Sequence, residues 1–98
     1  MKIFYKTKVE IQKMRDANLL VSDILDQLED RCRPGVSTAE LNELADRALK
    51  KSGGHSAFLG YANPPYPAVI CTSRNAVIVH GIPRRDEVLK AGDIVGID

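Results

Sequence analysis

Hydrophobic side chains recur every three or four residues along two stretches of the chain, and this spacing predicts two amphipathic helices. The first runs from about residue 8 to residue 31, with an apolar stripe that we expect to be core rather than partner surface: Met14, Ala17, Val21, Ile24, Leu25 and Leu28. The second runs from residue 38 to about residue 51, with its own inner face: Leu41, Leu44, Ala45, Ala48 and Leu49. A capping box precedes each helix, because Thr7 and Ser37 are each followed three residues later by glutamate.

After residue 67 the pattern changes to short apolar runs rich in β-branched residues, which predicts strands over 68–72, 76–80 and 94–98. The first two runs are separated only by the polar trio at 73–75, which predicts a tight connection between them. The expected fold class is therefore α+β: two helices packed on a small, mostly antiparallel sheet. At 98 residues, we expect residues 1–98 to form a single domain.

The segment 55–67, between the second helix and the strands, is rich in proline and tyrosine. Prolines at three positions prevent it from forming a central strand, so we expect a loop. Two interpretations of this loop stay open from the residues alone. It is either a surface connection with aromatic plugs, or a rigid wall of an apolar pocket in which prolines hold tyrosines in place.

Composition and charge exclude several classes of function. A formal net charge of +1 gives no argument for nucleic acid or a membrane surface as a partner. No apolar run approaches the ~20 residues that a bilayer requires, and the start of the chain does not look like a secretion signal. Cys32 and Cys71 are far apart and are expected to be free thiols in a reducing cytosol. A zinc site built on Cys71 and His80 would lack two further ligands.

His80 is the main candidate for chemistry that the residues themselves offer. It ends an apolar run and is followed by Gly81 and Pro83, which break regular structure. An imidazole placed in this way can exchange a proton near neutral pH. A packed or solvated histidine is the alternative, and the residues alone do not decide between the two.

Four segments, in order and spacing, resemble the type I methionine aminopeptidases. They are RPGVSTAEL at Arg33–Leu41, CTSRN at Cys71–Asn75, VHGIP at Val79–Pro83 and LKAGDIVGID at Leu89–Asp98. The resemblance covers nearly the whole chain from about the first helix onward. It implies one half of the pita-bread fold of the creatinase and aminopeptidase enzymes. It also implies metal-dependent removal of the N-terminal (initiator) methionine from nascent polypeptides as the activity of the full enzyme.

The same resemblance implies roles for individual residues. His80 would hydrogen-bond the substrate near the scissile amide and assist proton movement. Tyr66 and Cys71 fall on the family's pattern for the site that holds the methionine side chain. Tyr61 does so less directly, because this loop is one residue longer than the usual one. Phe58 stands where the family often has a small or polar residue and is not assigned to the pocket.

The resemblance further implies that Asp98 is the first of five metal-binding side chains. The full-length enzyme would hold two divalent metal ions, cobalt, manganese, iron or zinc. Since the other four ligands are missing, we expect this chain alone to bind no metal stably and to lack aminopeptidase activity. We expect His80 and Asp98 to face a common cleft walled by Tyr66 and Cys71. Because the last run ends on Asp98 in mid-strand, we expect a chain cut from a longer domain.

The alternative to the enzyme is a non-catalytic pita-bread relative that binds peptides or proteins. The presence of both His80 and Asp98 favours the enzyme. A small zinc or nucleic-acid module has neither the ligand spacing nor the charge. The expected partner is the N-terminal methionine of nascent polypeptides in the cytoplasm, with the ribosome as a further candidate. We also expect the open sheet face to make the isolated chain self-associate.

Overall fold

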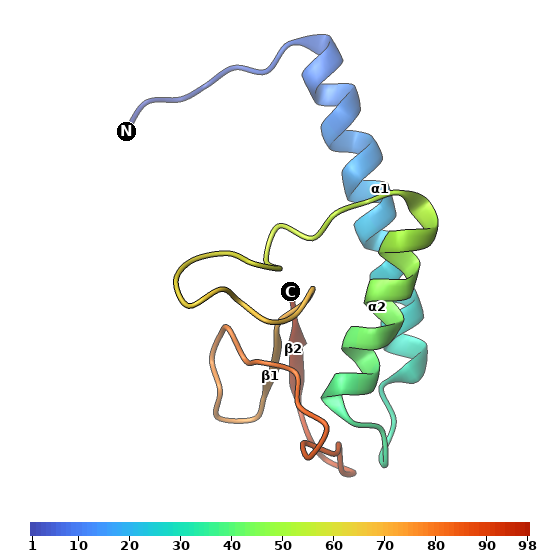
Figure 1. Cartoon of the computed structure of the whole chain (residues 1–98). Helices are drawn as coiled ribbons and strands as arrows, with labels where there is room; N and C mark the ends of the chain where they lie inside the picture. Colours follow the sequence, from blue (N-terminus) through green and yellow to red (C-terminus); the bar gives the residue numbers. More distant parts are fainter.

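The computed structural model describes residues 1–98, with two helices followed by two short strands. The elements are α1 (Lys8–Arg31), α2 (Thr38–Ser52), β1 (Thr72–Arg74) and β2 (Val95–Ile97). The helices lie side by side, the strands and long loops lie beside them, and the first residues extend away from the rest (Figure 1). Neither helix combines the length and the apolar character needed to cross a membrane.

Both predicted helices are confirmed, and their starts follow the predicted caps. At α1 the Thr7 amide donates to the Glu10 carboxylate (2.9 Å), and the Glu10 amide donates to the Thr7 hydroxyl (3.2 Å). Ser37 and Glu40 repeat the arrangement at α2, at 2.7 Å and 3.2 Å. Each box satisfies two amides that a helix leaves free. Helix α2 ends at Gly53, whose φ of 77° is a left-handed conformation that glycine adopts at little cost.

The core lies where the second half of α1, the inner face of α2 and the chain before β1 meet. Its seven buried members are Ile24, Leu28, Leu41, Ala45, Val69, Ile70 and Leu89. The inner face predicted for α2 is confirmed, since its other members, Leu44, Ala48 and Leu49, pack against this cluster. The core therefore holds the chain before β1 against the helices.

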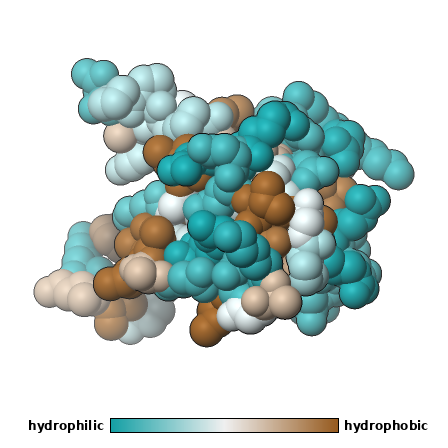
Figure 2. Space-filling view, turned by 90° about the horizontal axis from the view of Figure 1, so that it is seen from below, coloured by the Kyte–Doolittle hydropathy of each residue, from teal (hydrophilic) through white to brown (hydrophobic).

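The stripe predicted for α1 is only partly buried, which corrects the expectation from its periodicity. Ile24 and Leu28 are buried, but Met14, Val21 and Leu25 are exposed by 40–51%. The reason is length: α2 has 15 residues and α1 has 24, so α2 is shorter by about 14 Å. Helix α2 does not cover the first half of α1, and the N-terminal residues 4–6, which line a hollow beside it, leave its apolar side chains exposed. Hydrophobic groups reach the surface in several places among hydrophilic ones (Figure 2).

The sheet has two antiparallel strands, in agreement with the α+β class, but the predicted strands are corrected in extent. Thr72 lies opposite Ile97, Ser73 opposite Gly96 and Arg74 opposite Val95. Of the run 68–72 only the last residue is strand, although 68–71 are buried. Of the run 94–98, only the middle three residues form β2.

The run 76–80 forms no strand at all, contrary to the prediction. Its β-branched side chains are exposed, by 45% at Val77, 90% at Ile78 and 61% at Val79. β1 pairs with β2 along one edge only. On its other edge the Val77 amide donates to the Arg74 carbonyl (3.1 Å), and the Gly81 carbonyl accepts from the Thr72 amide (2.8 Å), so the run forms a loop that is closed at both ends and is not a paired strand.

Candidate functional site

An apolar cavity of about 430 Å³ lies between the proline-rich loop and the segment that ends at Gly81. This volume is in the range of small-molecule sites. Four of the five residues that the sequence singled out line it together: Tyr61, Tyr66, Cys71 and His80. Prolines, Phe58 and Ile82 complete most of the wall. His80 is itself an exposed residue, so it borders this apolar cavity from the solvent side.

The loop 55–67 is held by hydrogen bonds at its base and within itself. The Ser56 hydroxyl donates to the Val69 carbonyl (2.6 Å) and accepts from the Phe58 amide (3.1 Å). Further along, the Gly60 amide donates to the Tyr66 carbonyl (2.8 Å). Asn42 of α2 accepts from the Val69 amide (2.9 Å), which ties the loop's exit to the helix. The loop combines the two interpretations, because most of its residues are exposed and several of them line the apolar cavity.

Tyr66 joins this loop to the segment that carries His80. Its hydroxyl lies 3.0 Å from the Ile70 carbonyl and 3.1 Å from the Gly81 carbonyl, and these two acceptors share its single proton. Its ring meets the ring of Phe58 edge-on, with 6.2 Å between the centroids. Burial raises the pKa of Tyr66, and the neighbouring Cys71 thiol raises it further. The hydroxyl therefore keeps its proton and remains a donor.

His80 stands in an uncommon backbone conformation next to a glycine that no other residue could replace. Its φ of 61° lies in the left-handed region. Gly81 donates its amide to the Ser73 hydroxyl (3.0 Å) and passes so close to β1 that an added Cβ would lie 2.0 Å from the Thr72 carbonyl oxygen. Close backbone approach, not a positive φ, therefore requires glycine at 81.

Asp98, the fifth predicted residue, does not line this cavity. It lines a second, mostly aliphatic cavity of about 280 Å³ beside α1 and α2, and Phe58 lines both cavities. Its backbone exchanges hydrogen bonds of 2.8 and 3.1 Å with Cys71, directly across the sheet. Residues paired in this way project to the same face. His80 and Asp98 thus line two neighbouring cavities that have Phe58 in common, and the backbone pairing puts Asp98 on the same face of the sheet as Cys71 of the first cavity.

The residues present do not fit a complete metal centre. Nowhere in the 98 residues do three or more His, Cys, Asp or Glu side chains gather closely enough to hold a metal ion. Asp98 alone could supply one carboxylate, and a paired-metal site needs several such ligands.

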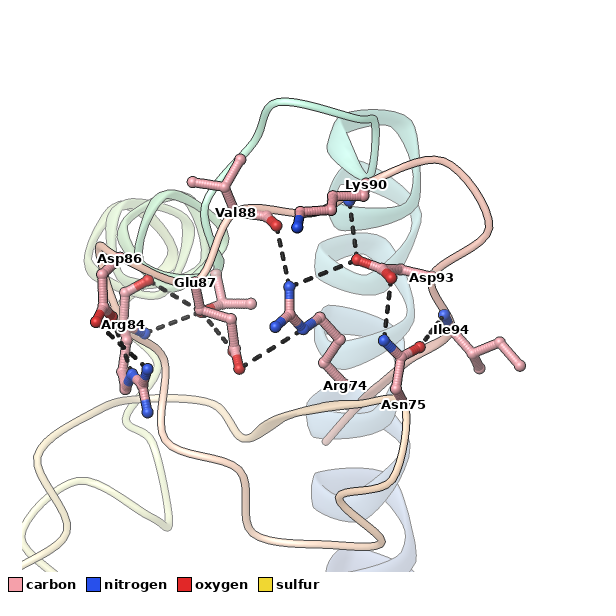
Figure 3. A network of polar contacts seen from close by, with 10 residues as sticks. Arg74, Asn75, Arg84, Asp86, Glu87, Val88, Lys90, Asp93 and Ile94 are labelled. Carbon is pink, nitrogen blue, oxygen red and sulfur yellow. Dashed lines mark hydrogen bonds and ion pairs between the residues drawn. The ribbon is translucent and has the colours of Figure 1, made fainter.

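A charged cluster, the Arg74 cluster, fixes the other end of β1 and comprises Arg74, Asn75, Glu87 and Asp93 (Figure 3). The Arg74 guanidinium lies 3.6 Å from the Asp93 carboxylate and 3.9 Å from the Glu87 carboxylate. Asn75 donates to Asp93 (3.0 Å) and accepts from the Ile94 amide (3.0 Å). The hydrogen bond from Asn75 is the main reason why the pKa of Asp93 is lowered, with the Lys90 amide next and nearby Arg74 adding to it.

Sequence reasoning missed Phe58 and Ile82 as lining residues, and it missed the contacts around Gly81. The composition of the loop offered a signal for Phe58. Aromatic rings that are close together in the chain tend to pack against one another, so Phe58 could be expected to line the same cavity as the two tyrosines. The role of Ser73 had no such signal. The sequence predicted a tight connection at 73–75, whereas Ser73 lies within β1, and only the fold brings its hydroxyl to the Gly81 amide.

Comparisons with known proteins place these features in a family. The profile of metallopeptidase family M24 matches residues 12–98. The chain is 48% identical over 92 residues to methionine aminopeptidase B of Synechocystis sp., covering 91% of this chain and 34% of that protein. It is 43% identical over 99 residues to methionine aminopeptidase of Escherichia coli K12, covering 100% of this chain and 37% of that protein.

Solved structures agree with the sequence matches. The chain is similar to methionine aminopeptidase from Rickettsia prowazekii, with a TM-score of 0.91 and 40% identity, over 99% of this chain and 38% of that one. For the enzyme from Thermotoga maritima the TM-score is 0.92 and the identity 34%, over 98% of this chain and 38% of that one. The chain thus spans little more than a third of the length of these relatives.

Proposed function

The chain belongs to metallopeptidase family M24, and we propose that it is the N-terminal portion of a methionine aminopeptidase, which removes the initiator methionine from nascent polypeptides. The single observation that carries the proposal is the apolar cavity with His80 in its wall. The four collinear motifs and the relatives' names support the same activity.

The cavity suits a methionine side chain in size and in chemistry. Methionine is unbranched and flexible, and its sulfur makes favourable contacts with aromatic rings. The rings of Phe58, Tyr61 and Tyr66 line the cavity and offer such contacts. In this proposal Tyr61, Tyr66 and Cys71 bind the side chain. His80 binds the substrate next to the amide that is cleaved, where an imidazole can hold or pass a proton.

The complete enzyme is proposed to use two divalent metal ions, drawn from cobalt, manganese, iron and zinc. Bound together, such ions polarise a carbonyl and activate water. Asp98 would provide one carboxylate, and the other ligands would have to come from residues outside these 98. We accordingly propose that the 98-residue chain alone is inactive. The proposed place of action is the cytoplasm, on nascent chains at or near the ribosome.

The test uses the complete gene product, meaning the whole polypeptide encoded by the gene that contains this chain. It is stripped of metal with a chelator, reloaded with one divalent metal at a time, and given the matched peptides Met-Ala-Ser and Leu-Ala-Ser. We expect metal-dependent release of methionine from the first and little release of leucine from the second, measured by mass spectrometry. His80→Asn should lower kcat by about 10²–10⁴-fold, the range for a positioned acid or base.

The control is Lys51→Ala, because Lys51 is an exposed residue of α2 that lines neither the His80 cavity nor the Asp98 cavity. It is expected to keep its activity. If the complete protein released no methionine with any of the four metals, the aminopeptidase proposal would be wrong. If the 98-residue chain released methionine by itself, the proposed incompleteness of its metal site would be wrong.

The exposed apolar side chains support a second, structural proposal. Ile11, Met14, Leu19 and Val21 are each exposed by half or more along α1. We propose that the rest of the enzyme covers this surface, and that the isolated chain self-associates through it. Light scattering of the isolated chain should show a mass that rises with concentration. Replacing Met14 and Val21 with glutamine should reduce the rise, and a constant monomer mass without these changes would contradict the proposal.

A further inference from the structure

The backbone of Gly81 is held from three directions by hydrogen bonds. Its carbonyl oxygen accepts from the Thr72 amide at 2.8 Å and from the Tyr66 hydroxyl at 3.1 Å. Its amide donates to the Ser73 hydroxyl at 3.0 Å. Both backbone polar groups of this one residue are thus satisfied by β1 and by the proline-rich loop. We call this set of contacts the Gly81 latch.

The segment before the latch has little else to hold it. Residues 76–80 form no strand, and Val77, Ile78 and Val79 are exposed. His80 itself takes the left-handed conformation, which is uncommon for a residue with a side chain. A conformation of this kind persists only where its surroundings enforce it. The Gly81 latch is the adjacent contact that can do so.

We infer that the Tyr66 hydroxyl and the Ser73 hydroxyl are positioning groups for His80: through Gly81 they hold the imidazole in the wall of the apolar cavity. The inference rests on the proposed function and gives Tyr66 a task beyond lining the pocket. Its ring provides apolar wall. Its hydroxyl, whose proton the Gly81 and Ile70 carbonyls share, helps to fix His80, the residue before Gly81.

Tyr61 supplies the comparison that separates the two tasks. It lines the same cavity, but it is 72% exposed and its hydroxyl makes no hydrogen bond. Removing the hydroxyl from Tyr61 therefore changes the pocket wall alone. Removing it from Tyr66 changes the wall and also takes one donor from the Gly81 latch. The difference between the two variants measures the positioning role.

The experiment compares Tyr66→Phe, Tyr61→Phe and Ser73→Ala in the complete gene product loaded with metal. We expect Tyr66→Phe and Ser73→Ala each to lower kcat about tenfold relative to Tyr61→Phe, with KM changed less than about twofold, as for a group that aligns the reacting residue. In histidine-labelled protein without substrate, the imidazole NMR signals of His80 should shift or broaden in these two variants. The His55 signals serve as the internal reference and should stay unchanged.

The two readouts separate this inference from the proposed function. If the protein has no aminopeptidase activity but the His80 signals move in Tyr66→Phe and not in Tyr61→Phe, the positioning role is supported and the proposed function fails. If the His80 signals and kcat in Tyr66→Phe match those in Tyr61→Phe, or if only KM rises, the inference is overturned. Should Tyr66→Phe fail to fold, Ser73→Ala decides by the same criteria.

Discussion

The two ends of β1 are fixed by different kinds of polar contact. At its start, the Gly81 latch consists of amides, a carbonyl and two neutral hydroxyls. At its end, the Arg74 cluster joins one guanidinium to two carboxylates, with Asn75 bridging to the start of β2. Both arrangements hold a chain segment beside the same short strand, but only the second depends on charge.

This difference teaches what each end of the strand should respond to. Neutral hydrogen bonds keep their strength across the range in which carboxylates titrate, and salt affects them little. Ion pairs of partly exposed groups weaken with added salt and vanish when the acid is protonated. The placement of His80 should therefore persist under conditions that loosen the connection between β1 and β2.

The largest effect on stability is expected from Gly81→Ala, which changes the Gly81 latch at the start of β1. The added methyl would lie 2.0 Å from the Thr72 carbonyl oxygen, and 2.9 Å from the Ser73 Cα, so the backbone would have to separate. We expect a loss of at least about 3 kcal/mol in the free energy of unfolding, at the upper end for overpacking. Urea unfolding of the complete gene product, followed by circular dichroism, measures it.

Gly53→Ala is the matched control, because Gly53 has φ 77° and nothing within 4 Å of an added Cβ. Gly53→Ala is expected to lower the free energy of unfolding only by the conformational cost of a left-handed residue, about 1–2 kcal/mol. If Gly81→Ala cost no more than Gly53→Ala, the backbones would not be in the close contact described, and the Gly81 latch would lose its basis.

A smaller, pH-dependent effect is expected at the charged end from Asp93→Asn. The pKa of Asp93 is lowered in the folded protein, so the folded state binds this proton less readily than the unfolded chain does. The stabilisation is present above about pH 4, the ordinary pKa of aspartate, and is lost as the pH falls through the lowered value. Asp93→Asn should therefore be less stable than the unchanged protein at pH 7, with a gap that narrows toward pH 3.

Urea midpoints of both proteins, measured at intervals between these pH values, give the gap directly. Adding sodium chloride at pH 7 should also reduce it, since salt screens the attraction between Asp93 and Arg74. The gap between Gly81→Ala and the unchanged protein should show neither dependence. A gap at Asp93 that stayed constant with pH would mean that its charge does not stabilise the fold.

The helices could be predicted from the sequence because their signals are local. A capping box lies within four residues, and both boxes are formed as expected. Periodicity also identified the inner face of α2. It could not show how far along α1 a partner extends, because that depends on the length of α2, and so Met14 and Val21 were wrongly expected to be buried.

The strands were less predictable because a strand depends on its neighbour. The run 76–80 has the composition of a strand, yet it forms a loop, and the strand that pairs with β1 is β2, which is distant in sequence. β-branched residues fit well on a pleated sheet, but they form a strand only where a neighbouring strand is present to pair with. The run 68–72 was recognised as buried, but most of it lies before β1.

The candidate site followed from motifs more than from general physical rules. The resemblance pointed to Tyr61, Tyr66, Cys71 and His80, and the structure brings all four to one cavity. The resemblance gave no indication that Phe58 lines both this cavity and the one that Asp98 lines. Such a shared wall arises from how the loop folds back on the helices, and neither spacing nor composition records it.

The left-handed backbone at His80 restricts how this position can be probed by substitution. Asparagine, like histidine, is among the residues that adopt this conformation more readily than most, whereas β-branched residues resist it strongly. Asparagine therefore removes the imidazole and leaves the chain path in place. Valine would change the backbone conformation and remove the imidazole at the same time. A loss of activity in His80→Val could therefore not be attributed to the missing imidazole alone.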